Sequence, residues 1–256
     1  MQNNYVIKLS RVSKTFKIRK INSYSIRELL LNHSIYKSDS KQTLKALSNI
    51  DLEINQGETF GVIGRNGSGK TTLLNIIMES IAPDKGGIVE TKGRILRLSL
   101  GIGIDPNLSA RDNIYVNGSL IGLTFDKIGE IFDAIINFAD LNNFIDTPVK
   151  FFSRGMKQRL LFSIAMYAEA DIFLLDEFFG GTGDQNFREK SDRAFTKKIL
   201  AGKTIVVVSH NMNIIKKYCE NVIWLENGEI RDSGKASEVI NSYNRHMKIP
   251  NDIHNP

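Results

Sequence analysis

The feature that most constrains this chain is a glycine-rich segment at residues 64–72, Gly-Arg-Asn-Gly-Ser-Gly-Lys-Thr-Thr. The residues before it (58–63) predict a strand, and those after it (73–78) predict an apolar helix. This spacing and context are those of a phosphate-binding loop, in which bare N–H groups and the positive end of a helix face a triphosphate. Lys70 can reach the outer phosphates, and the Thr71 hydroxyl can ligate Mg²⁺. The expected phosphate contacts are Gly64, Arg65, Asn66, Gly67, Ser68, Gly69, Lys70, Thr71 and Thr72.

The composition is that of one globular domain. At 256 residues, 41% of them apolar, the chain can bury a sizeable core. No apolar run reaches the roughly 18 residues that span a bilayer, and the first residues lack the pattern of a signal peptide, so we expect a cytoplasmic protein. The single cysteine, Cys219, excludes an internal disulfide and is expected to be a buried apolar side chain.

The net charge of +6 leaves several kinds of partner open. A basic protein suits nucleic acid, and it equally suits the anionic face of a membrane. The basic residues are spread along the chain, which a solvated surface also explains. Charge alone does not choose between these readings.

Two predicted strands end in polar residues. Residues 172–177 are four apolar residues followed by Asp176 and Glu177, and residues 203–210 are a second apolar run that ends at His210. Strands that are apolar throughout are buried on both faces of a parallel sheet, and functional residues lie at their carboxyl ends. Asp176 can hold Mg²⁺, Glu177 can polarise an attacking water, and His210 can contact a γ-phosphate or hold a carboxylate.

A second candidate anion site precedes a long apolar helix. Residues 153–159 read Ser-Arg-Gly-Met-Lys-Gln-Arg, which combines a capping serine, a glycine and free N–H groups at a helix start. An ordinary helix cap explains the same residues. Near the start of the chain, Phe16 follows the first predicted strand (residues 5–9), where its ring could belong to the core or stack on a purine.

Four motifs follow one another along the chain: the glycine-rich loop, residues 153–158, residues 174–177 and His210. Together they resemble the motifs of the ATPase subunits of ABC transporters. The resemblance covers about residues 5–245. It implies a P-loop NTPase core of the ABC type, with a mixed α/β sheet, an antiparallel β subdomain and a helical subdomain. It also implies that two copies pair head to tail around ATP and Mg²⁺. Glu177 then resembles the catalytic carboxylate, His210 the switch histidine and Phe16 the adenine-stacking aromatic. The signature residues Ser153, Arg154, Gly155 and Met156 would complete the nucleotide site of the other copy, and Asp184 would contact that copy.

The departures from the family pattern narrow the resemblance. The signature reads Ser-Arg-Gly-Met-Lys, Leu100 stands where the family has a switch glutamine, and the residues after Glu177 are unusual. Together with residues 111–118 and the extra segment near Ile26, these departures resemble the ATPases of polysaccharide exporters for O-antigen, capsule or teichoic acid. The expected form is the short one, without a carbohydrate-binding C-terminal domain.

The resemblance also sets expectations about domains and partners. We expect an ABC ATPase domain over residues 1–248, with a helical insertion at about 18–44, a helical subdomain at about 105–165, and a flexible tail at 249–256. The partners implied are a second copy and two copies of a membrane permease, with only indirect contact to the polysaccharide and none to nucleic acid. The implied location is the cytoplasmic face of the cell membrane. An importer subunit and a soluble ABC ATPase that acts on nucleic acid remain the alternatives.

Overall fold

The computed structural model describes residues 4–19, 41–99, 103–178, 185–198 and 202–248. Its central element is a six-stranded sheet with the strand order β5-β6-β7-β3-β8-β9. Neighbouring strands are parallel except for the antiparallel pair β8 and β9, so the sheet is mixed, as expected. The strands are β3 (Thr59–Ile63), β5 (Ile95–Ser99), β6 (Ile172–Asp176), β7 (Thr204–Val208), β8 (Asn221–Glu226) and β9 (Glu229–Lys235).

Both faces of this sheet are covered. Side chains alternate between two apolar clusters, so that Leu174 of β6 packs with one cluster and Leu175 with the other. The first cluster contains helix α2 (Lys70–Ile77), and the second contains helices from later in the chain. These are α5 (Arg154–Ala165), α6 (Gln185–Lys198), α7 (Met212–Tyr218) and α8 (Ala236–Lys248). Burial on two faces explains why the strands are apolar throughout.

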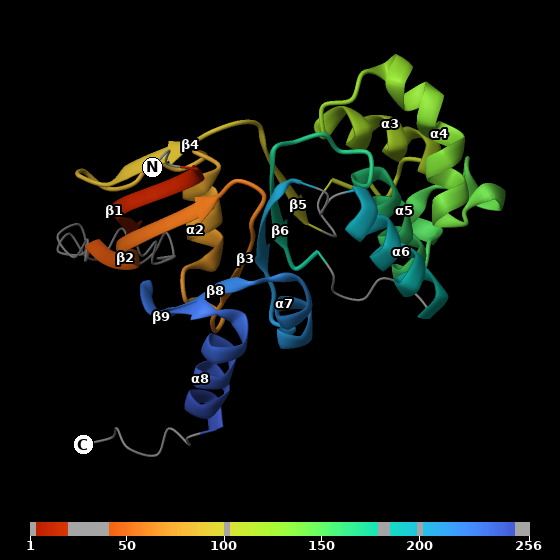
Figure 1. Cartoon of the computed structure of the whole chain (residues 1–256). Coiled ribbons are helices and arrows are strands. Elements are labelled where there is room, and N and C mark those ends of the chain that lie inside the picture. Colours follow the sequence, from red (N-terminus) through yellow and green to blue (C-terminus); the bar gives the residue numbers. More distant parts are fainter. Residues whose placement is uncertain (1–3, 20–40, 100–102, 179–184, 199–201, 249–256) are drawn as a thin grey trace, which may run out of the picture.

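A second, antiparallel sheet has the strand order β2-β1-β4 and packs beside α2 (Figure 1). Its strands are β1 (Tyr5–Arg19), β2 (Lys41–Asn55) and β4 (Ile88–Thr91). The strands β1 and β2 are longer than the sequence suggested, because their pairing continues to Arg19 and Lys41. The ends of the expected insertion at 18–44 are therefore strand, and its expected helix lies outside the described residues, as does the tail at 249–256.

The helical subdomain forms a separate lobe (Figure 1). It contains α3 (Ala110–Leu120), α4 (Phe125–Ala139), the short 3₁₀ helices η2 (Asn142–Phe144) and η3 (Val149–Phe151), and α5. These helices share their own apolar cluster. Ser109 caps α3 in a capping box with Asp112. The lobe is linked to the main sheet through α5, whose Phe162 packs in the second cluster.

Strand β3 is packed tightly at Gly61. A Cβ atom there would lie 2.7 Å from Val222 Cγ2 and 3.3 Å from the Sγ of Cys219. Cys219 is buried, as expected, and burial raises the pKa of its thiol to about 12. The absence of a side chain at Gly61 therefore lets α7 and β8 approach the strand that carries the phosphate-binding loop.

We expect Gly61→Ala to destabilise the protein by about 1–3 kcal/mol, because overpacking forces its neighbours apart. Thermal or urea unfolding measures the change. Gly129→Ala is the matched control, since the nearest atom to its added Cβ is Tyr115 Oη at 3.7 Å. That exposed helical site should gain about 0.5–1 kcal/mol. Equal stability of the two variants would contradict the tight packing at Gly61.

Candidate functional site: a nucleotide site at the carboxyl ends of the sheet

The glycine-rich loop connects β3 to α2, and three of its positions have a backbone conformation that favours glycine. Gly64, Gly67 and Gly69 have φ values of 152°, 81° and 106°. A Cβ atom on Gly64 would lie 2.2 Å from the carbonyl oxygen of Leu225, and one on Gly69 would lie 2.5 Å from that of Ala46. The loop is thus fixed against two other strands, while a Cβ on Gly67 would meet nothing within 4 Å.

Hydrogen bonds hold the loop in place. The backbone N–H of Gly228, in the β8–β9 turn, donates to the carbonyl of Ser68 at 3.0 Å, and Ser48 N–H donates to the carbonyl of Gly228 at 2.8 Å. The Ser68 hydroxyl is buried, and no partner for it occurs among the described residues. A turn, a strand and a helix therefore fix a backbone whose remaining N–H groups can face an anion.

Lys70, the first residue of α2, folds back over the loop. Its Nζ donates to the carbonyls of Gly64 and Arg65, both at 2.8 Å, and the residue is only 8% exposed. Burial lowers the pKa of Lys70, while the nearby carboxylates of Glu177 and Asp176 act in the opposite direction. The ammonium group is therefore held against the carbonyl groups of the loop, in the position that a phosphate-binding lysine requires.

The carboxylates of β6 reach the same edge of the sheet. Asp176 pairs with Val208 of β7, which also pairs with Val62 of β3, so all three strands end together beside the loop. Two strand spacings separate β6 from β3, or roughly 10 Å. The register therefore brings Asp176 toward Lys70, across more than 100 residues of sequence.

Glu177 has an unusual backbone conformation. Its φ is 50°, which is uncommon for a residue other than glycine. Its N–H donates to the carbonyl of Val208 at 3.0 Å, and its Oε1 accepts from the N–H of His210 at 2.9 Å. The His210 Nε2 lies 3.6 Å from the same oxygen. The loop after β7 therefore aims the Glu177 carboxylate, and the backbone N–H of His210 makes one of the two contacts left open for this residue, that to a carboxylate.

These residues fit a nucleotide and its metal ion. Thr71 follows Lys70 at the start of α2, and the Asp176 side chain is 17% exposed at the facing strand end. No cluster of three carboxylate, histidine or cysteine side chains that could hold a metal occurs in the described part of the chain. One hydroxyl and one carboxylate suit Mg²⁺, which keeps several waters and takes further ligands from phosphates.

The signature residues lie elsewhere in the fold. Ser153 caps α5, and its Oγ accepts from the N–H of Met156 at 3.2 Å, while Arg154 is exposed beside it. Gly155 is half-buried in the first turn. Helices α5 and α2 pack on opposite faces of the sheet, so Ser153 does not join Lys70 within one chain. The helix start has the form expected of an anion site, and it is separate from the loop.

Phe16 lies on the β1–β2 strand pair that borders the loop. It pairs with Leu44, three residues along β2 from Leu47, whose side chain lies near Gly69. The ring is half-buried, with Lys14 Nζ 5.6 Å from its centroid. Its role as an adenine platform stays a prediction. Asp184 and Leu100 lie outside the described residues.

Arg97 of β5 joins the site, although its sequence motif did not point to a site residue. One of its Nη atoms pairs with Asp176, and the other donates to Asn75 Oδ1 of α2 at 2.8 Å. A signal for it existed, because an arginine between the apolar residues Leu96 and Leu98 of a half-buried strand requires a partner.

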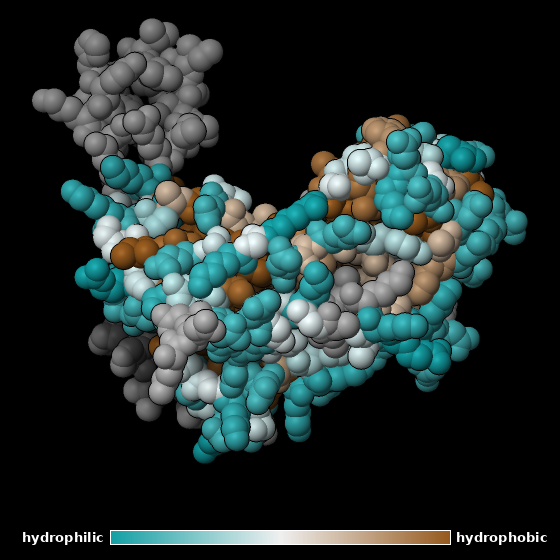
Figure 2. All heavy atoms as spheres, turned by 45° about the horizontal axis from the view of Figure 1, so that its top comes forward, coloured by the Kyte–Doolittle hydropathy of each residue, from teal (hydrophilic) through white to brown (hydrophobic). Residues whose placement is uncertain are grey.

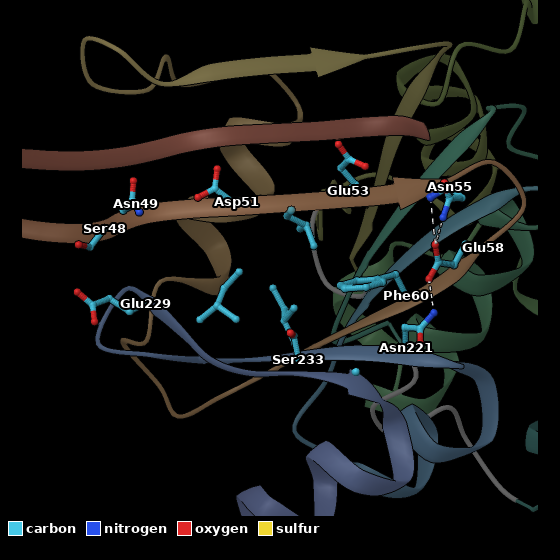
Figure 3. Close-up of a pocket in the computed structure, with 14 residues that line it drawn as sticks. Ser48, Asn49, Asp51, Glu53, Asn55, Glu58, Phe60, Asn221, Glu229 and Ser233 are labelled. Atoms are coloured by element: carbon cyan, nitrogen blue, oxygen red, sulfur yellow. Dashed lines mark hydrogen bonds between the residues drawn. The ribbon is translucent and has the colours of Figure 1, made fainter. Parts of the chain in front are cut away.

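A separate groove of about 700 Å³ lies between β2 and β9 (Figure 3). Several carboxylates line it, and three of them already have partners. Glu58 accepts from Asn221 and Asn55, Asp51 accepts from the N–H of Arg11, and Glu53 pairs with Lys8. None of the residues predicted for the nucleotide site lines this groove.

Comparison with known proteins agrees with this geometry. The sequence profile of the ABC transporter family matches residues 47–180, more than half of the chain. The chain belongs to the ABC transporter ATPase family. The match spans the loop, the signature and the carboxylates of β6, which are the parts of the site placed above.

Three similar proteins illustrate the likeness to this family. The teichoic acids export ATP-binding protein TagH of Bacillus cereus is 36% identical over 250 residues, which cover 98% of this chain and 44% of that protein. The O-antigen export system ATP-binding protein RfbB of Myxococcus xanthus is 37% identical, covering 94% and 56%. The dimeric structure of MJ0796, a bacterial ABC transporter cassette, aligns with a TM-score of 0.68 and 25% identity, covering 90% and 98%. The chain thus spans about half the length of TagH and of RfbB.

Lys70→Ala should weaken nucleotide binding by about 10- to 100-fold, because a charged hydrogen bond to phosphate is lost. Titration with a fluorescent ATP analogue measures the effect. Lys127→Ala is the control, since Lys127 is exposed and pairs with its neighbour Glu130 on α4. A folded Lys70→Ala protein with unchanged affinity would contradict the assignment of the loop.

Proposed function

We propose that this chain binds and hydrolyses ATP with Mg²⁺ to drive export of a lipid-linked polysaccharide through a separate membrane permease. The observation that carries the proposal is similarity at 36–37% identity over nearly the whole chain to ATP-binding proteins of teichoic acid and O-antigen export systems. The departures in the signature and at Leu100 also support an exporter. They weigh against an importer subunit.

The working unit that we propose is a homodimer. Within one chain, the loop around Lys70 and the signature around Ser153 belong to helices on opposite faces of the sheet. A nucleotide that contacts both must therefore lie between two copies, and MJ0796, a structural neighbour, is dimeric. In such a dimer Arg154 adds a cation next to the exposed N–H groups of α5, where phosphate charge would be favoured.

The chemistry that we propose for each residue follows from its position. Lys70 and the loop N–H groups bind the outer phosphates and stabilise charge that develops on them. A bound Mg²⁺ ion, held by Thr71 and Asp176, supplies further neutralisation of that charge. Glu177 accepts a proton from the attacking water, and the backbone N–H of His210 keeps its carboxylate oriented. His210 can donate from its ring to the γ-phosphate.

The permease partner is supported by an exposed apolar patch on the helical subdomain. Val116, Leu120 and Phe125 are 42%, 68% and 67% exposed there, and Figure 2 shows apolar side chains gathered on this lobe. Exposed apolar patches of this kind mark contact sites for other proteins. No helix in the described part of the chain is long and apolar enough to cross a membrane. We place the complex at the cytoplasmic face of the cell membrane.

Glu177→Gln should lower ATP turnover by about 10²- to 10⁴-fold, since the amide cannot accept the proton of the attacking water. Phosphate release by the purified complex with its permease measures this rate. Nucleotide binding should persist, and an ATP-bound dimer should accumulate on size-exclusion chromatography.

Glu169→Gln is the matched control, because Glu169 is exposed and precedes the buried strand β6 rather than following it. Its turnover should equal that of the unaltered complex. Unchanged turnover in Glu177→Gln would refute the catalytic assignment. ATP turnover without any polysaccharide export in cells would refute the transport assignment.

A further inference from the structure

Arg97 occupies an exceptional position in the main sheet. In the register of β5 and β6 it lies opposite Leu174, and Asp176 is the next residue of β6 on the same face. An arginine is long enough to span this diagonal, and its other end meets Asn75 on α2. One side chain therefore connects β5, the helix that follows the phosphate-binding loop, and the carboxylate at the end of β6.

The contacts fix this guanidinium firmly. An Nη atom forms an ion pair with Oδ2 of Asp176, and the other Nη donates to Asn75 Oδ1 at 2.8 Å. The two side chains of the ion pair are 20% and 17% exposed, so water screens them little. The Nε of Arg97 is buried and has no hydrogen-bond partner among the described residues. That burial is costly, so packing alone does not account for an arginine at this position.

We propose that Arg97 is a positioning residue that balances the charge of Asp176 in the nucleotide-free protein and competes with Mg²⁺ for this carboxylate. The proposal rests on the proposed function, because it concerns the same nucleotide site. A guanidinium and a divalent cation on one carboxylate repel each other, so binding of the metal requires Arg97 to shift or to share Asp176.

This competition selects the form in which the metal is bound. A free Mg²⁺ ion carries two positive charges toward Arg97 and Lys70, which repel it. In the complex with ATP the phosphates outweigh the charge of the metal, so the repulsion by the same two cations is offset. Arg97 therefore disfavours free Mg²⁺ and keeps the Asp176 carboxylate oriented until the metal arrives with its nucleotide.

The test is a Mg²⁺ titration of nucleotide binding by the full chain. A fluorescent, non-hydrolysable ATP analogue is held at a fixed concentration, and the Mg²⁺ concentration at half-maximal binding is measured. Arg97→Met should lower this midpoint by roughly fivefold or more, the scale of one unit charge in contact with the metal site. Affinity for the analogue at saturating Mg²⁺ should stay unchanged, which separates this role from a general loss of structure.

Arg94→Met is the matched control. Arg94 lies immediately before β5, and its guanidinium donates to the carbonyl of Ile121, away from Asp176. Its midpoint should equal that of the unaltered protein. Asn75→Ala, which removes the hydrogen bond that orients Arg97, should shift the midpoint in the same direction by a smaller factor. This variant keeps the proposal testable if Arg97→Met does not fold.

Three outcomes would overturn the inference. The midpoint could stay the same or rise in Arg97→Met, which would mean that Arg97 does not compete with the metal. It could fall equally in Arg94→Met, which would mean that net charge alone is responsible. Failure of the unaltered protein to bind the analogue at any Mg²⁺ concentration would overturn the proposed function and this role for Arg97 together.

Discussion

The site depends on the parallel register of β6, β7 and β3. Val208 pairs with Asp176 on one side and with Val62 on the other, so three strands from distant parts of the sequence end at one edge. Hydrogen bonds between parallel strands set this alignment, and apolar side chains on both faces fix it. A slip of the register by one residue would move every side chain of a strand to the opposite face of the sheet. Lys70, Asp176 and Glu177 face the same space because the sheet is built in this way.

The same edge concentrates charge in a partly dry environment. Lys70 is buried beside its own loop, and Arg97 neutralises Asp176. Burial lowers the pKa of Lys70, while the carboxylates at the end of β6 support its charged form. Positive and negative groups are thus held close together in advance of any ligand. The positive φ of Glu177 shows that the backbone accepts strain to aim this carboxylate.

Much of the fold was predictable because its signals are local. The continuous apolar runs of β6 and β7, the capping box at Ser109, the cap at Ser153 and the Asn-Gly turn after β8 depend on neighbouring residues, and all are present. The lengths of β1 and β2 were not predictable, because their extension to Arg19 and Lys41 arises from pairing between the two strands rather than from the residues of either one. β4 likewise pairs with β1 rather than with its neighbours along the chain.

By itself, the sequence determined that a phosphate-binding loop, two carboxylates, a histidine and a helix-capping signature exist in this chain. Each is a short pattern whose chemistry follows from residue type and spacing. Only the tertiary structure decided which of them meet. It brings Asp176, Glu177 and His210 together, places α5 and α2 on opposite faces of the sheet, and adds Arg97 to the site. These relations depend on strand register and on which face of the sheet each helix covers, and both are set by long-range packing that no local pattern records.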